Sequence, residues 1–141
     1  MPLNRVQNGS ALSSTLITVA IVIIALVFAA TLLPRGFSDD LSRIGQGRPA
    51  VVLTHDKEAV ASQELMNMLN GIRGDYEDRV EFLVTDVVTP EGREFVESQR
   101  VGNSLLVLFD GAGNRIAVID GIRDAQILRS TLETRLHLLP P

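Results

Sequence analysis

Near its N-terminus the chain has one long apolar run. Residues 15–33 read TLITVAIVIIALVFAATLL, which is 19 residues without a charge, a proline or a glycine. A helix of this length rises about 28 Å at roughly 1.5 Å per residue, close to the hydrocarbon thickness of about 30 Å. Pro34 breaks the run. The pattern predicts a tail over residues 1–14 and a transmembrane helix over residues 15–34.

Two other interpretations of this run stay open. A cleaved secretory signal has a basic leader and an apolar stretch of roughly 7 to 15 residues. Here the leader holds only Arg5, although Val27, Phe28 and Ala29 would serve as a cleavage box. A buried helix of a soluble core has a polar stripe, which this run lacks. We therefore favour an uncleaved, single-pass signal anchor.

The two arguments about membrane orientation disagree. Arg5 precedes the run, whereas Arg35, Arg43 and Arg48 follow it, so the positive-inside rule favours a cytoplasmic C-terminal domain. Against this stands the common arrangement in which a short tail stays inside and a long domain is exported. We follow the second argument and expect an extracytoplasmic domain.

After the apolar run the chain first loses and then regains regular periodicity. Residues 35–48 contain three glycines, two serines and mixed charge, which predicts a flexible linker. From residue 49 to residue 141, short β-branched runs alternate with stretches whose apolar residues recur every three to four positions. The predicted strands are 50–53, 80–87, 105–109 and 115–120, and the predicted helices are 57–73, 89–100 and the stretch after Asp124.

Capping residues support two of these helices. Thr89 can act as N-cap with Pro90 in the first helical position, and Asp124 can cap the last helix. That last helix has an apolar face formed by Leu128, Leu132, Leu136 and Leu139. The two strands around residues 110–114 form a hairpin, and the helix between the first two strands implies a parallel pair. The fold class is α/β, with a mixed sheet and flanking helices.

This order of elements resembles the thioredoxin fold from Pro49 to about Leu139. Residues 49–72 look like the family's first core strand and active-site helix, and residues 80–87 are similar to its next strand. Residues 101–122 resemble the segment that holds a cis-proline, a strand, a glycine turn and a further strand. The resemblance implies a βαβ-α-ββα domain, here preceded by one N-terminal transmembrane helix.

The chain departs from the family at each redox position. An ungapped comparison places Ala59 and Ser62 where the family has its two cysteines, Leu53 where it has a buried acid, and Ser104 where it has the cis-proline. Disulfide exchange requires a thiolate and a second, resolving thiol. We therefore expect no thiol–disulfide oxidoreductase activity, and an ordinary trans peptide bond before Ser104.

Composition narrows the function further. The chain has 141 residues, no cysteine, 13 basic and 17 acidic residues, and a net charge of −4 at pH 7. The length fits one domain with an appendage. Without cysteine there are no disulfides, zinc thiolates, iron–sulfur clusters or thiol nucleophiles. Residues 36–141 hold 11 of the basic and all 17 acidic residues, a net charge of −6, so nucleic acid is not expected as a partner.

Three polar residues follow the first predicted strand and are candidates for other chemistry. His55, Asp56 and Ser62 could support a cysteine-independent enzyme if their side chains met within about 2.6 to 3.2 Å. The only other histidine is His137, and no spacing supplies a third metal ligand, so neither a metal nor a cofactor is expected. The simpler interpretation is a loop histidine without a role and a Ser62 hydroxyl that meets backbone N–H groups in the first helical turn.

The sequence leaves three hypotheses about function. We favour a membrane-tethered, redox-inactive thioredoxin-like domain that acts as a protein-interaction or scaffold module. Its groove would lie between the helix start at Ala59 and Ser62 and the loop with Gly102, Asn103 and Ser104, where the family holds extended polypeptide. Its expected partners are membrane lipid along residues 15–33 and a protein of unknown identity. The alternatives are the enzyme just described and a structural subunit of a membrane complex.

Overall fold

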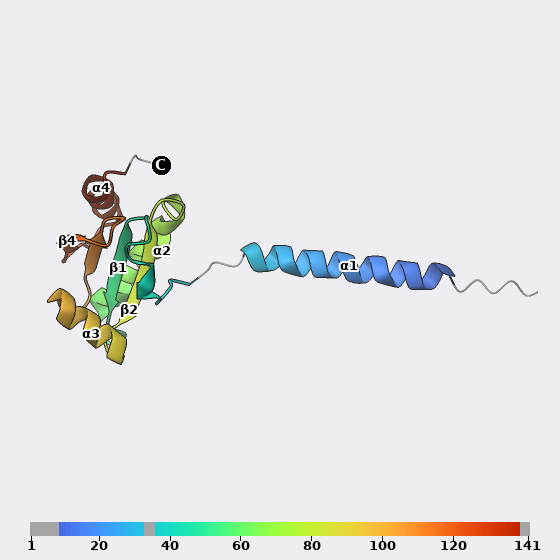
Figure 1. Ribbon diagram of the computed structural model, residues 1–141, viewed down its shortest axis with the longest axis horizontal. Coiled ribbons are helices and arrows are strands. Elements are labelled where there is room, and N and C mark those ends of the chain that lie inside the picture. The colour runs from blue at the N-terminus through green and yellow to red at the C-terminus, as the bar shows by residue number, and fades with distance from the viewer. Residues whose placement is uncertain (1–8, 33–35, 139–141) are drawn as a thin grey trace, which may run out of the picture. The chain divides into compact units, whose positions relative to one another are not determined.

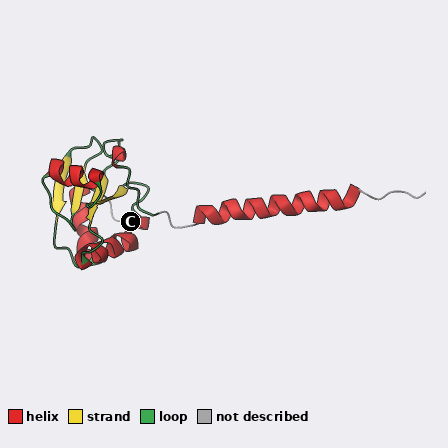
Figure 2. Cartoon of the chain, turned by 90° about the horizontal axis from the view of Figure 1, so that it is seen from below, coloured by secondary structure: helices red, strands yellow, loops and turns green. Residues whose placement is uncertain are grey.

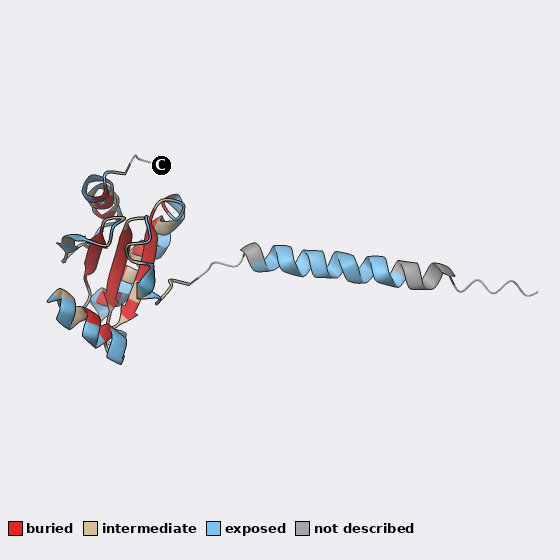
Figure 3. Cartoon of the chain, in the orientation of Figure 1, coloured by how far each residue is buried: buried red, intermediate tan, exposed pale blue. Residues whose placement is uncertain are grey.

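The computed structural model describes residues 9–32 and 36–138, and the chain divides into two units, residues 1–36 and 37–141. The first unit contains the helix α1 (Gly9–Leu32). Its large apolar side chains between Leu16 and Phe28 are all at least half exposed (Figure 3). Within the described part of the chain, no helix is long and apolar enough to cross a membrane. Residues 1–8 of the predicted tail and Pro34 lie outside the described residues.

The second unit is built on a four-stranded mixed sheet with the strand order β2-β1-β3-β4. Strand β1 pairs in parallel with β2 and antiparallel with β3, and β3 and β4 form the predicted hairpin. The strands are β1 (Ala50–His55), β2 (Glu81–Asp86), β3 (Leu106–Phe109) and β4 (Arg115–Ile119). The mixed α/β sheet predicted from the sequence is therefore present.

Helices cover both faces of this sheet (Figures 1 and 2). They are α2 (Val60–Ile72), α3 (Pro90–Gln99) and α4 (Ala125–Leu136). Successive residues of β1 point to opposite faces, because side chains alternate along a strand. Val51 and Leu53 pack with α2 and α4, whereas Ala50 and Val52 pack with Phe95 of α3. Two apolar cores therefore hold the central strand in place.

The predicted caps of α3 and α4 are confirmed. Thr89 Oγ1 accepts the Gly92 N–H at 3.1 Å, and the Asp124 carboxylate accepts the N–H groups of the next helix at 2.8 and 3.0 Å. Helix α2 begins at Val60, three residues later than predicted. Asp56 forms a turn before it, with its carboxylate accepting the Glu58 N–H at 3.0 Å, and this turn delays the helix. Leu139 of the predicted α4 face lies outside the described residues.

The region expected to be a linker, residues 35–48, packs against the domain from Phe37 onward. The Val84 N–H on the outer edge of β2 donates to the Ser38 carbonyl at 2.9 Å, and Ser38 pairs with Leu83 as an isolated parallel bridge. Arg73 lies over the Phe37 ring, 4.8 Å from its centroid. We call residues 37–48 the docked segment, because these contacts make it part of the fold.

A single carboxylate holds the other end of the docked segment. Glu81, at the start of β2, forms ion pairs with Arg43 at 2.8 Å and with Arg48. The Glu81 side chain is 11% exposed, whereas both arginine side chains are more than 40% exposed. Leu41 and Ile44 pack against the core on the α3 face. Local periodicity carries no sign of these contacts, because they join positions far apart in the chain.

Candidate functional site

The end of β1 is hydrogen-bonded to the start of α2 through Ser62. This serine lies in the first turn of α2 and is fully buried. Its Oγ accepts the Asp56 N–H at 2.9 Å and lies 2.9 Å from His55 Nδ1. The backbone N–H that Ser62 meets is therefore that of Asp56, ahead of the helix, and not one of the first helical turn as expected, so the contact joins the helix to the turn that precedes it.

His55 is the last residue of β1, rather than a loop residue, and it is half-buried. Ser62 Oγ has one proton and two lone pairs, so besides accepting the Asp56 N–H it can either donate to His55 Nδ1 or accept a proton from it. The contact fixes the ring against the start of α2.

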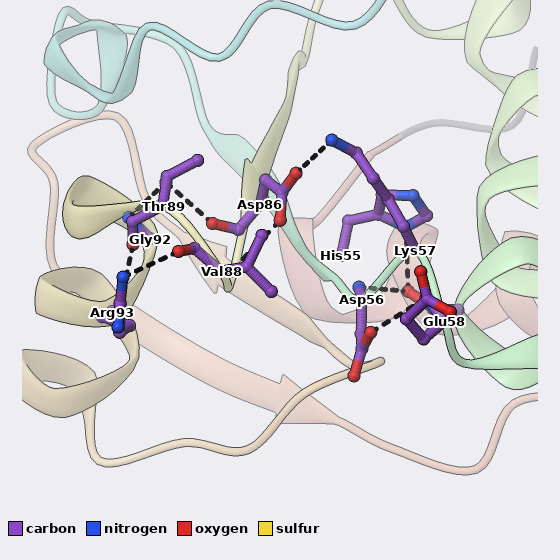
Figure 4. A network of polar contacts seen from close by, with 10 residues as sticks. His55, Asp56, Lys57, Glu58, Asp86, Val88, Thr89, Gly92 and Arg93 are labelled. Carbon is purple, nitrogen blue, oxygen red and sulfur yellow. Dashed lines mark hydrogen bonds and ion pairs between the residues drawn. The ribbon is translucent and has the colours of Figure 1, made fainter.

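The third member of the hypothetical enzyme site is turned away from the other two. The Asp56 carboxylate accepts the Glu58 N–H and, at 3.3 Å, the Asn103 side-chain amide (Figure 4 shows the first of these contacts). Among the described side chains it makes no contact with His55. The Ser62 hydroxyl is also sealed from solvent. His55 and Ser62 meet the distance requirement, but a substrate has no access to the hydroxyl.

An ion pair closes the same edge of the sheet beside His55 (Figure 4). Lys57 Nζ lies 2.5 Å from an oxygen of Asp86, which is the register partner of His55 in the parallel pair. The hydrogen bond from Lys57, assisted by the Val88 N–H, lowers the pKa of Asp86 below its usual value, and the same bond raises the pKa of Lys57. Local sequence pattern gave no sign of this pair, because Lys57 follows β1 and Asp86 ends the neighbouring parallel strand β2, and only the sheet brings them together.

Loop residues 102–105 are fixed to β1 by Thr54, which is fully buried. Thr54 Oγ1 donates to the Gly102 carbonyl at 3.0 Å and accepts the Leu105 N–H at 3.2 Å. The Ser104 N–H donates to the Thr54 carbonyl at 2.7 Å. Ser104 has a φ of 60°, in the left-handed region, where a residue with a side chain costs about 1 to 2 kcal/mol.

A small hollow of about 110 Å³ lies beside this loop. Its walls come from α2, from the loop and from the segment that connects β4 to α4. The lining residues are Ala61, Glu64, Leu65, Asn103, Ser104, Asp120, Gly121, Ile122 and Arg123. Of the predicted groove positions, Asn103 and Ser104 line the hollow, whereas Ala59, Ser62 and Gly102 do not. The segment 120–123 was missed because its approach to α2 depends on tertiary packing.

Comparison with solved structures finds thioredoxins. A thioredoxin from Thermus thermophilus is 22% identical, with a TM-score of 0.60 over 70% of this chain and 84% of its own. The germline-specific thioredoxin Deadhead from Drosophila melanogaster is 15% identical, with a TM-score of 0.59 over 71% and 98%. Thioredoxin O2 from Arabidopsis thaliana, in its oxidised state, is 19% identical, with a TM-score of 0.55 over 66% and 83%.

The domain has a thioredoxin-like fold. At these identities the similarity concerns the fold alone. No protein-family model matches the chain, and no characterised protein matches it by sequence. The fold predicted from the order of elements is therefore present, in a domain that has no cysteine at the start of α2.

The positions that the sequence comparison aligns with the family's redox residues hold groups of different chemistry in this domain. Ala59, the residue before α2, offers no side-chain hydrogen bond to the helix, and Ser62 is buried in the contacts described above. Leu53 is part of the apolar core. No cis peptide bond occurs within the described residues, and Ser104 uses its N–H internally. In the same part of the chain, no group of three histidine, aspartate or glutamate side chains is placed to hold a metal ion.

Proposed function

We propose that the chain is a membrane-tethered, redox-inactive protein whose thioredoxin-like domain holds an extended segment of a partner protein. The observation that carries this proposal is the state of the loop beside the hollow. The Gly102 C=O and the Ser104 N–H are held by Thr54, whereas the N–H and C=O of Asn103 between them both have no hydrogen-bond partner in the described structure. Asn103 is exposed and lines the hollow.

The free backbone groups at Asn103 favour a partner in an extended conformation. Extended segments bind through main-chain hydrogen bonds, with alternate side chains directed to the receiving surface. The Gly102 carbonyl and the Ser104 N–H are both occupied by Thr54, so Asn103 is the residue of this loop at which both backbone groups are available, with the Gly102 N–H and the Ser104 carbonyl on either side of it. A partner segment would therefore pair with the backbone around Asn103 and lie beside the hollow.

The proposed redox inactivity follows from the absence of cysteine in the sequence. The sequence has no cysteine, so the chain has no thiolate to attack a disulfide. A serine hydroxyl at position 62 has no comparable acidity, and here it already accepts one hydrogen bond and contacts the neighbouring histidine. The expected result for purified protein is no reduction of insulin disulfides above buffer.

The proposed tether is the apolar run of residues 15–33, which α1 contains as far as Leu32. Residues 15–33 have no charge, and the large apolar side chains described there are exposed on all sides of the helix. Exposed apolar surface of this extent is normally covered by lipid or by another protein. We favour lipid because the 19 uncharged residues of the sequence run approach the thickness of the hydrocarbon core, although no helix within the described residues meets the length and apolarity of a membrane span. We place the domain outside the cytoplasm. Protease treatment of intact cells and of spheroplasts tests both statements.

Site-specific photocrosslinking tests the binding proposal. A benzophenone amino acid at position 103 of the full-length chain in its native membranes is expected to crosslink to a protein. The variant A61W fills the hollow and should abolish that crosslink. N70W, on the exposed side of the same helix, should leave it unchanged. Crosslinks to lipid only, or a crosslink that A61W does not reduce, would overturn the proposal.

A further inference from the structure

We infer that the segment held beside Asn103 is basic, with lysine or arginine at alternate positions. This inference rests on the proposed function and adds the chemical class of the partner. Two carboxylates line the hollow from different elements, Glu64 from α2 and Asp120 from the segment after β4, and Glu58 lies exposed just before α2. None of the three forms an ion pair with another described residue.

The positive charges nearby do not balance these carboxylates. Lys57 is paired with Asp86. Arg123 is the basic residue among those that line the hollow, and it follows Asp120 closely in the same wall. The N-terminal end of α2 would itself attract an anion, but the carboxylates of Asp56 and Glu58 already precede that end. The approach to the groove is therefore net negative, as is the whole domain.

The lining of the hollow suits the stem of a long basic side chain. Its volume of about 110 Å³ is large enough to admit such a stem. The buried Leu65 and the half-buried Ile122 provide an apolar surface for such a stem. Lysine and arginine place their stems on apolar surface while the charged head stays at the rim. Here the head would meet Glu64 or Asp120.

An extended backbone paired with Asn103 directs every second side chain to the same surface. A segment with basic residues two positions apart would therefore place one stem in the hollow and the next head along the acidic approach. An acidic segment would meet like charges at both places. The geometry thus selects for charge and for alternate spacing together.

Binding of three synthetic peptides to the full-length chain in mild detergent tests this inference. The probes are eight-residue peptides that alternate alanine with lysine, with glutamate or with glutamine. We expect the lysine peptide to bind about tenfold more tightly than the glutamine peptide at low salt, and the glutamate peptide to bind more weakly than both. The advantage should shrink as salt is added, because exposed charges are screened.

Paired variants locate the effect at the groove. E64Q/D120N should remove most of the advantage of the lysine peptide, whereas E94Q/E97Q, two exposed positions on α3, should preserve it. Equal binding of lysine and glutamine peptides would overturn the inference, as would an equal loss in E94Q/E97Q, which would indicate only the net charge of the domain.

The same experiment separates this inference from the proposal beneath it. If all three peptides bind equally and A61W abolishes their binding, the groove is correct and the basic class is wrong. If none of the peptides binds and position 103 crosslinks no protein, the groove itself is wrong, and the inference falls with it.

Discussion

Replacing Ser104 with proline, the residue that the thioredoxin pattern places there, should disrupt the loop instead of restoring a family feature. Proline fixes φ near −65°, whereas Ser104 has a φ of 60°. Proline also lacks the N–H that donates to the fully buried Thr54 at 2.7 Å. Leaving that acceptor without its donor costs about 1 to 3 kcal/mol, and the forced change of φ adds to it. We expect S104P to lose about 3 kcal/mol or more.

Two matched variants separate the backbone effect from the side chain. No hydrogen bond involves the Ser104 hydroxyl within the described structure, so S104A should change the free energy of unfolding by less than about 0.5 kcal/mol. Glycine adopts a positive φ without steric cost, so S104G should gain about 1 kcal/mol. The order of stability should therefore be glycine, then serine and alanine together, then proline.

Urea titration of the full-length chain in mild detergent, followed by far-ultraviolet circular dichroism, measures these differences. The midpoint and the slope should be fitted separately, because a change in slope would signal a change in the unfolded state. Wild-type stability in S104P would refute both the left-handed conformation and the importance of the hydrogen bond to Thr54. A loss in S104G would refute the strain argument alone.

Three further predictions concern contacts described above. E81A leaves Arg43 and Arg48 without their shared carboxylate and should lower the free energy of unfolding by about 1 to 3 kcal/mol. The loss should be smaller than for a fully buried ion pair, because both arginine side chains are partly exposed to water. Amide hydrogen exchange in the docked segment should become faster in this variant. Because the pKa of Asp86 is lowered in the folded state, its ionised form stabilises the fold above the unfolded pKa, near 3.9, and this stability is lost as pH falls through the folded pKa. Between pH 2 and 7, the urea midpoint of D86N should therefore fall less on acidification than the urea midpoint of the wild type. Lys57, whose pKa is raised, contributes stability that is lost only in strong base. S62A removes the acceptor of the half-buried Asp56 N–H and the contact with the His55 ring, and should cost about 1 to 3 kcal/mol in the same urea titration.

The sequence was informative wherever local pattern decides structure. Thr89 and Asp124 cap helices because an oxygen two or three residues before a free N–H is enough, whatever lies beyond. The strands of the central sheet were equally visible, since their apolar runs are continuous. The start of α2 was predicted three residues too early, because Asp56 favours a turn that competes with the helix.

The candidate site was less predictable, because its parts come together only in the fold. Asn103 and Ser104 were placed by the resemblance to a family pattern, and both line the hollow. Asp120 was not predicted as a site residue, since it follows β4 and lines the hollow only because of the way the hairpin packs. The contacts of the Ser62 hydroxyl with His55 and Asp56, at the end of β1, also depend on tertiary packing. Side-chain contacts between positions dozens of residues apart leave no mark on local periodicity.

The docked segment has a practical consequence for anyone who shortens the chain. A fragment beginning at Pro49 would start with the outer edge of β2 bare, because the carbonyl of Ser38 that now occupies the Val84 N–H would be gone. Bare sheet edges recruit other strands and promote aggregation. A fragment that begins at Phe37 keeps this edge covered. The start of a soluble fragment should therefore lie twelve residues before Pro49.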